Sequence, residues 1–369
     1  MIFISLESHS LTLEEIKLLS SPLGKKWIAG IVIFKENLSN ENTIDHLKLL
    51  LGKIQRINPR LLTAIDEEGG RVQRTQDFTD FIPLQSAHDQ GKLYESDKTK
   101  GQDNIIKNTE ACGKNLYQMF DINFAPCVDI HDNASPIIGK LGRSFNKDPK
   151  IIQECSNIIL NVYRKYNLIG TLKHFPGHGR THTDTHHIQQ SVDNRDEIAI
   201  LNDIKVYQEI YQRSQSPLMI MTNHVIYPNL FTSKDSNMPV CYRTIITKKL
   251  KEICPSSVII SDCLNMGSLE HYDQINQKTS STKHNLSQRL INTLNAGHDI
   301  AMLTHQPASV MSQLIEYLDL KCQPKPKTLA NILEFSSTNR SARLEWKNIH
   351  DEQLLERGSH NIKPSTLSV

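Results

Sequence analysis

Residues 168–174 read Leu-Ile-Gly-Thr-Leu-Lys-His, a short apolar run that ends in two polar side chains. Runs of this kind recur along the chain and stand between segments with a helical pattern. Their apolar residues are continuous rather than alternating, which is typical of strands buried on both faces of a parallel sheet. We count eight predicted strands, at 2–6, 30–34, 61–65, 122–128, 168–172, 218–221, 258–260 and 300–303.

The intervening segments carry helix signals. Thr12 and Glu15 have the spacing of a capping box, and Asp148 precedes Pro149 as an N-cap precedes a first-turn proline. A stripe with helical spacing comprises Ile44, Leu47, Leu51 and Ile54. Eight alternating units predict an α/β fold, a (β/α)₈ TIM barrel. A doubly wound open sheet produces the same local pattern and remains the alternative.

The chain has 369 residues, which one barrel of roughly 250 residues with insertions and a tail would account for. We expect a single barrel domain over residues 1–321. A Gln-Pro-Lys-Pro-Lys hinge at 323–327 then opens a C-terminal extension, 322–369, with a helix around 342–355 and a disordered end.

Composition argues against several classes of partner. Lys and Arg number 42 against 40 Asp and Glu, a balance that creates no field strong enough to attract nucleic acid or a membrane surface. No apolar run approaches the ~20 residues of a membrane span. We therefore expect a small-molecule partner and a monomer.

The cysteines and the N-terminus indicate the compartment. The chain has 7 cysteines, an odd number, and no C-x-x-C pair, so neither a disulfide framework nor a zinc knuckle is suggested. The first ten residues, MIFISLESHS, lack the basic and apolar regions of a signal peptide. We expect a cytoplasmic protein.

Polar residues stand where the predicted strands end. In a barrel these positions face one mouth, and catalytic residues gather there. A polar residue at any one strand end is unremarkable, but their recurrence supports both the barrel and an active site. The residues are Asp66, Asp129, Lys173, His174, Asn223, His224, Asp262 and His305.

The segment 173–186, Lys-His-Phe-Pro-Gly-His-Gly-Arg-Thr-His-Thr-Asp-Thr-His, is the most specific stretch. Its histidines recur every fourth residue, but Pro176, Gly177 and Gly179 prevent the helix that would stack them as a metal site. In an irregular loop, Asp184 can hold one ring nitrogen of His186 and leave the other for proton transfer. A zinc hydrolase that uses these histidines is the alternative and predicts sensitivity to a chelator.

Residues 259–266, Ile-Ile-Ser-Asp-Cys-Leu-Asn-Met, place Asp262 at the tip of the seventh predicted strand. A carboxylate there can attack an anomeric carbon and form a covalent glycosyl-enzyme. The competing interpretation is that Asp262 caps the following helix.

Residues 64–74 read Ala-Ile-Asp-Glu-Glu-Gly-Gly-Arg-Val-Gln-Arg, in which Gly69 and Gly70 permit a tight turn. A carboxylate and an arginine here can hydrogen-bond sugar hydroxyls. A phosphate-binding loop competes, but the GxGxxG and Walker spacings are absent and two acidic residues would repel the anion. Arg143, within Gly142-Arg-Ser-Phe145, is a further ligand candidate or the partner in a surface salt bridge.

These motifs, in this order from about residue 24 to about residue 305, resemble glycoside hydrolase family 3 and, within it, bacterial β-N-acetylhexosaminidases of cell-wall recycling. The resemblance implies a retaining exo-β-N-acetylglucosaminidase that acts on muropeptides and needs no metal or cofactor. It implies Asp262 as nucleophile, His186 as general acid/base and Asp184 as its orienting partner. The implied sugar-binding residues are Asp66, Arg74, Arg143, Lys173 and His174.

Three positions depart from the family pattern: Cys263 replaces an acidic residue, Glu67 stands where glutamine is frequent, and Asn146 follows Arg-Ser-Phe. None removes a proposed catalytic group.

A third possibility, a catalytically silent sugar-binding protein, would need neither Asp184 nor Asp262. If the loop 175–187 carries the acid, we expect it to be mobile or displaced while the site is empty.

Overall fold

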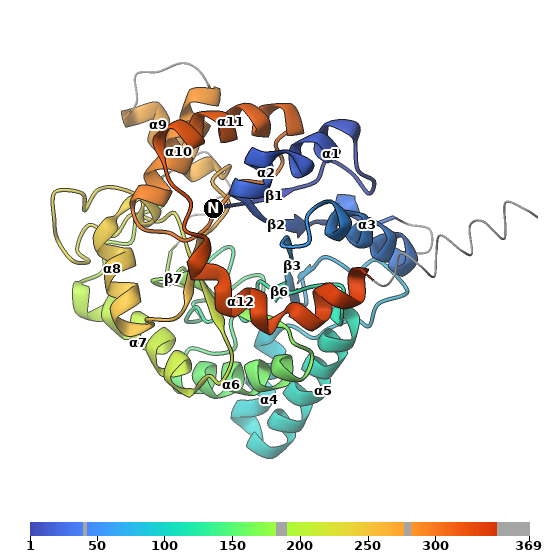
Figure 1. The fold of residues 1–369 in the computed structure, drawn as a ribbon. Coiled ribbons are helices and arrows are strands. Elements are labelled where there is room, and N and C mark those ends of the chain that lie inside the picture. The colour runs from blue at the N-terminus through green and yellow to red at the C-terminus, as the bar shows by residue number, and fades with distance from the viewer. Residues whose placement is uncertain (40–42, 182–189, 277–281, 345–369) are drawn as a thin grey trace, which may run out of the picture.

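A computed structural model describes residues 1–39, 43–181, 190–276 and 282–344. The predicted barrel is confirmed: eight parallel strands run in the order β10-β1-β2-β3-β6-β7-β8-β9 (Figure 1). A bridge between Ile260 and Ile300 joins the two ends of this order, which distinguishes a closed barrel from an open sheet. The strands are β1 (Ile2–Ser5), β2 (Ile28–Ile33), β3 (Leu62–Ile65), β6 (Ile122–Asn123), β7 (Ile169–Phe175), β8 (Leu218–Thr222), β9 (Val258–Ser261) and β10 (Ala301–Met302).

Helices surround the barrel. Both predicted N-caps are confirmed: Thr12 and Glu15 form a complete capping box, and the Asp148 carboxylate accepts from the backbone N–H of Lys150 at 2.9 Å. The helices are α1 (Leu13–Ser20), α2 (Pro22–Trp27), α3 (Thr43–Ile57), α4 (Ala87–Ser96), α5 (Lys98–Leu116), α6 (Pro149–Lys165), α7 (Glu197–Arg213), α8 (Thr244–Ile253), α9 (Gly267–Asn276), α10 (Thr282–Asn295), α11 (Ala308–Lys321) and α12 (Ala330–Phe335).

Two of the strands that carry site residues differ in length from the sequence prediction in ways that affect the site. The fourth predicted strand forms regular pairs only at residues 122–123, because Pro126 has no N–H to give to a ladder. A bridge from Cys127 to Lys173 nevertheless keeps this segment beside β7. The fifth extends to Phe175, so Lys173 and His174 belong to β7 itself.

The core has two layers, which follow from strand alternation. Ile2 and Ile4 of β1 pack outward in a large cluster with the surrounding helices. Phe3, between them, packs inside the barrel with residues such as Phe124 and Ile260. A barrel filled in this way is solid along its axis and offers a site only at its ends.

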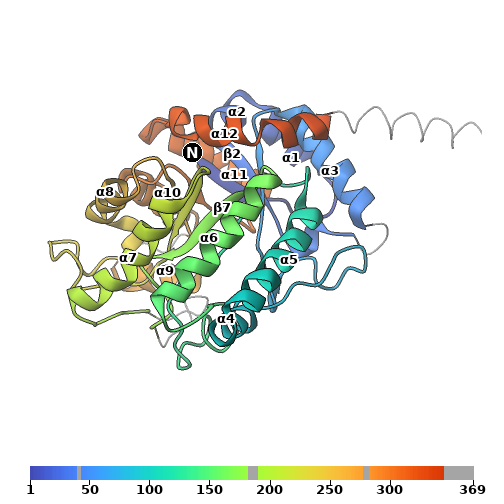
Figure 2. The same cartoon turned by 90° about the horizontal axis from the view of Figure 1, so that it is seen from below.

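The segment after α11 crosses the end of the barrel at which the strands begin (Figures 1 and 2). Ile332 of α12 joins the inner cluster. Arg343 is completely buried, and its guanidinium contacts the Asp121 carboxylate at 2.7 Å and the Gln55 side-chain oxygen at 2.8 Å. Of the helix expected at 342–355, residues 342–344 are helical within a segment that begins at 337, and the rest lies outside the described residues. A domain boundary at 322 stays a proposal.

Within the ranges given above, no helix combines the length and the apolar character that crossing a membrane requires.

Candidate active site

An open cavity of about 410 Å³ lies at the carboxyl ends of the barrel strands. Phe34, Met221 and Met302 contribute apolar surface to its wall, next to a group of charged side chains. Six of the eight predicted catalytic and sugar-binding residues line it: Asp66, Arg74, Arg143, Lys173, His174 and Asp262. The structure therefore gathers on one surface side chains that are up to 196 positions apart, from residue 66 to residue 262.

A small hairpin positions Asp66 and Arg74. Asp66 lies between β3 and β4 (Glu67–Gly69), and β4 pairs antiparallel with β5 (Val72–Gln73). The turn uses Gly69 and Gly70, with φ of 94° and 57°, a conformation that other residues rarely adopt. The chain thereby folds back, and the Arg74 guanidinium reaches the Asp66 carboxylate at 2.9 Å.

Charges of alternating sign continue from this hairpin across the cavity floor. The Lys173 ammonium contacts the Asp66 carboxylate at 2.8 Å and the Glu68 carboxylate at 2.5 Å. Arg143 donates two hydrogen bonds to the Glu68 carboxylate, from Nε to Oε2 at 2.9 Å and from Nη2 to Oε1 at 2.8 Å. We call Arg74, Asp66, Lys173, Glu68 and Arg143 the charge chain.

The pKa values in the charge chain follow from its ion pairs. Burial alone would raise the pKa of Asp66, but Lys173 and Arg74 outweigh it and hold that pKa below its usual range. Against the same effect of burial, Arg143 and Lys173 lower the pKa of Glu68 to about 2. The two carboxylates raise the pKa of Lys173, although burial opposes them. All these groups are therefore ionised at neutral pH.

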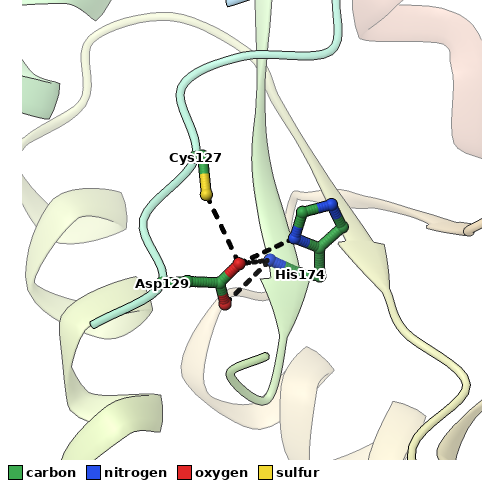
Figure 3. Close-up of side chains that lie close together, drawn as sticks. All are labelled: Cys127, Asp129 and His174. Atoms are coloured by element: carbon green, nitrogen blue, oxygen red, sulfur yellow. Dashed lines mark hydrogen bonds and ion pairs between the residues drawn. The ribbon is translucent and has the colours of Figure 1, made fainter. Parts of the chain in front are cut away.

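Asp129 orients His174 from beneath (Figure 3). Its carboxylate lies 2.7 Å from Nδ1 of His174 and accepts the backbone N–H groups of His174 and His178. Burial raises the pKa of Asp129, but His174 and the other donors outweigh it and lower that pKa to about 2. Nδ1 therefore carries the proton, and Nε2 accepts from the Arg143 guanidinium at 3.1 Å.

Cys127, Asp129 and His174 also bring three possible metal ligands within 4.8 Å of one another (Figure 3). Their hydrogen bonds account for the cluster without an ion. The Cys127 thiol donates to Asp129 at 3.4 Å, and burial raises its pKa well above the usual value, so it is not a thiolate. Nδ1 of His174 points its proton at the same carboxylate. This donor set fits a positioning role better than metal binding.

Asp262 lies directly after β9, and its backbone N–H donates to the Thr222 carbonyl at 2.8 Å. One carboxylate oxygen accepts the N–H of Cys263 at 2.7 Å. Helix α9 begins only at Gly267, so Asp262 does not cap it. In the ring of strands, β9 stands four positions from β3, so Asp262 and Asp66 approach the cavity from opposite sides.

Glu68 was not predicted from the sequence to be a site residue, although its spacing from Asp66 indicated that it would face the same way. Asp66 and Glu68 are two residues apart at the start of a strand, so their side chains point to the same face, while Glu67 points to the other. Accordingly, Glu67 accepts from the Thr75 hydroxyl and the Arg74 backbone N–H. Burial raises the pKa of Glu67 to about 7.

The other polar strand ends serve different purposes. His305 lines the cavity and pairs with Glu36 at 3.1 Å. Asn223 and His224 are buried behind the wall, where they donate to the backbone carbonyls of His174 and Cys263. These two support the site without lining it.

The structure also shows the contacts of two residues that depart from the family pattern. Cys263 lines the cavity, and its thiol contacts the Thr304 hydroxyl at 3.0 Å. Asn146 donates from its side-chain amide to the Glu95 carboxylate at 3.0 Å, away from the cavity. Neither contact touches the charge chain.

Asp184 and His186 lie in 182–189, outside the described residues, as do residues 182–187 of the loop expected to be mobile. The described part of that loop ends at Thr181. There, His178 lines the cavity, its Nδ1 lies 2.5 Å from the Thr181 hydroxyl, and burial lowers its pKa to about 4. His178 is therefore neutral near pH 7.

A closed barrel with a cavity at its carboxyl end, lined by acidic and basic side chains, is a common scaffold for enzymes that hydrolyse sugars. Comparison with known families identifies the chain as a glycoside hydrolase. Residues 12–329 match the model described as "Glycosyl hydrolase family 3 N terminal domain". The chain belongs to glycosyl hydrolase family 3, as the sequence motifs implied.

Relatives and solved structures agree with this assignment. The chain is 27% identical to a beta-hexosaminidase of Haemophilus influenzae over 355 residues, which cover 95% of this chain and 92% of the relative. A beta-hexosaminidase of Glaesserella parasuis is 28% identical over 361 residues, 95% of each. NagZ from Neisseria gonorrhoeae, solved in complex with N-trifluoroacetyl-D-glucosamine, has the same fold, with a TM-score of 0.75 and 24% identity over 90% of this chain and 88% of that chain.

Proposed function

We propose that this chain is a retaining exo-β-N-acetylglucosaminidase that removes terminal N-acetyl-β-D-glucosamine. The observation that carries the proposal is the cavity itself, in which Asp262 stands opposite the charge chain. Full-length relatives named beta-hexosaminidase support the choice of sugar.

The charge chain would bind the hydroxyls of the terminal sugar. Within the described residues, two carboxylates occupy two of the three N–H donors of Lys173, so a ligand hydroxyl can take the third. Asp66 offers oxygen acceptors, and Arg74, Arg143 and His174 complete the proposed binding surface. Fixed ionic groups of this kind bind a sugar without reorganising.

Asp262 would be the nucleophile. Its carboxylate attacks the anomeric carbon as the bond to the leaving oxygen breaks, and an ester between the sugar and Asp262 forms. Water then attacks the anomeric carbon, the ester bond breaks, and the carboxylate is restored with the β configuration retained. The hydrogen bond from the Cys263 N–H to Asp262 holds the carboxylate in position between these steps.

His186 would manage the proton, oriented by Asp184; this assignment rests on the sequence motif. As imidazolium, His186 would protonate the leaving oxygen. As neutral imidazole, it would then take a proton from the attacking water. The natural substrate, by the same resemblance, would be a muropeptide fragment in the cytoplasm, hydrolysed by a monomer.

Release of the chromophore from an aryl N-acetyl-β-glucosaminide, without added metal and in the presence of a chelator, tests the activity. Loss of activity with the chelator would favour a metal-dependent hydrolase instead. Incubation with a 5-fluoro N-acetylglucosaminyl fluoride followed by mass spectrometry tests the covalent step. We expect one attached sugar on the peptide that contains Asp262, and attachment elsewhere would contradict the proposed nucleophile.

A further inference from the structure

Glu68 has an unusual position among the acidic residues of the site. Of the two carboxylates in the charge chain, Asp66 lines the cavity, whereas Glu68 is not among the described residues that line it. Only 4% of the Glu68 side chain is exposed. It therefore acts on a ligand only through the cations that it contacts.

We propose that Glu68 is a positioning and specificity-determining residue, which neutralises Arg143 and Lys173 so that this surface binds uncharged sugar hydroxyls and rejects anionic groups. The proposal deepens the function given above and rests on it for the identity of the sugar. The site would accept a neutral terminal sugar and exclude a phosphorylated or sulfated sugar.

The contacts of Glu68 fix the geometry of two cations. Both of its oxygens accept from Arg143, through Nε and Nη2, so the guanidinium plane is held in one orientation. The oxygen that receives Nη2 also contacts the Lys173 ammonium. A rotation of Glu68 would therefore displace both cations at the same time.

A count of charges explains the rejection of anions. Arg74, Arg143 and Lys173 are positive, while Asp66, Glu68 and Asp129 are negative, so three cations meet three carboxylates. Asp262 adds a further carboxylate to the cavity. An incoming anion would therefore find no excess cation to pair with. Because burial makes an unpaired charge costly, the cavity would reject the anion.

The substitution Glu68→Gln removes this compensation with little change in shape. On this side of the cavity, opposite Asp262, one positive charge is then in excess, and the amide nitrogen confronts a cation. With the aryl glucosaminide, we expect KM to rise at least tenfold and kcat to change less than threefold, because these contacts bind ground state and transition state alike. Inorganic phosphate should become a competitive inhibitor of the variant, which loss of structure alone would not produce.

Two further variants control the experiment. Glu68→Asp keeps the charge and should remain insensitive to phosphate. Glu154→Gln makes the same chemical change at a carboxylate that contacts Lys98 at 3.0 Å on the surface, and should behave like the wild type. Phosphate inhibition of Glu68→Gln and of neither control would support the proposal.

Binding measurements separate this proposal from the proposed function. In isothermal titration calorimetry, inorganic phosphate should bind Glu68→Gln and not the wild type, whether or not either protein hydrolyses a glucosaminide. Phosphate binding by the wild type would overturn the proposal, and this measurement needs no variant to fold. A folded Glu68→Gln protein with unchanged KM and no phosphate binding would overturn it as well.

Discussion

The two ends of the barrel both bury charged side chains, but they use them differently. Where the strands begin, Arg343 and Asp121 are both 0% exposed and are enclosed by the C-terminal segment. Where the strands end, Arg74 and Asp66 keep 33% and 16% of their side-chain surface and line a cavity. An ion pair inside a barrel is therefore evidence of function only when a ligand can reach it.

The difference is also energetic. Removing charges from water is costly, and a buried pair roughly repays that cost only when its hydrogen bonds are complete. Within the described residues, the Arg343 guanidinium donates to Asp121, Gln55 and the backbone carbonyls of Gln118 and Met119. The open end keeps part of its hydrogen-bonding capacity for a ligand. We expect substitutions at one end to affect stability and substitutions at the other to affect activity.

Asp262→Asn should have the largest effect. An amide cannot form the glycosyl ester, so kcat should fall by on the order of 10³-fold or more while the melting temperature stays the same. Steady-state kinetics and a thermal melt provide both readings. The surface variant Asp45→Asn is the control, and full activity of Asp262→Asn would contradict the proposed nucleophile.

Arg343→Met should act at the opposite end. It leaves the Asp121 carboxylate buried without its cation, and we expect the free energy of unfolding to fall by roughly 3–5 kcal/mol. Urea denaturation measures this loss, while kcat/KM of the folded protein should not change. In contrast, Arg213→Met removes an exposed contact with Glu209 and should cost less than about 1 kcal/mol. Equal losses would remove the distinction between the ends.

Glu67→Gln should change how stability depends on pH. Burial raises the pKa of Glu67 from 4.5 to about 7, so the folded protein binds this proton more tightly than the unfolded chain. The contribution of Glu67 to stability is then complete below pH 4.5 and is lost as the pH rises to about 7. Glutamine does not titrate, so the variant should gain stability relative to the wild type over this interval, by on the order of 3 kcal/mol.

Urea denaturation of both proteins at about pH 5 and about pH 8 tests this expectation. The difference between the two proteins is the relevant quantity, because other groups titrate equally in both. A difference that does not depend on pH would mean that Glu67 has an ordinary pKa.

Cys263→Ala should have the smallest effect. Burial raises the pKa of the Cys263 thiol, so it is uncharged, and its side chain contacts Thr304 rather than Asp262. We expect kcat/KM to change by less than about threefold, a difference below about 1 kcal/mol. A loss above tenfold would show that this thiol helps to orient the nucleophile.

Local patterns predicted the fold well and the contacts less well. The eight apolar runs, the capping box at Thr12 and the proline at 149 each depend on neighbouring residues, and all are confirmed. Barrel closure needs a pairing between residues 260 and 300, which no local pattern specifies. Reading of strand ends placed eight residues at one mouth, and five of them line the cavity: Asp66, Lys173, His174, Asp262 and His305.

The partners of these residues were harder to predict, because they are far apart in the chain. Asp129 contacts His174 across 45 residues, and Asp121 contacts Arg343 across 222. Glu68 was within reach of sequence reasoning through strand alternation alone. A neutral thiol at Cys263 and a pKa of about 7 at Glu67 depend on burial, which only the folded chain defines.

The C-terminal segment has a practical consequence for attaching the protein to other objects. Met1 stands directly before β1, and Leu344, which is 39% exposed, follows Arg343, whose contact with Asp121 lies at the end of the barrel where the strands begin. A reporter, a solid support or a second protein coupled through residue 344 would face away from the mouth. Substrates with bulky leaving groups would then keep an unobstructed approach.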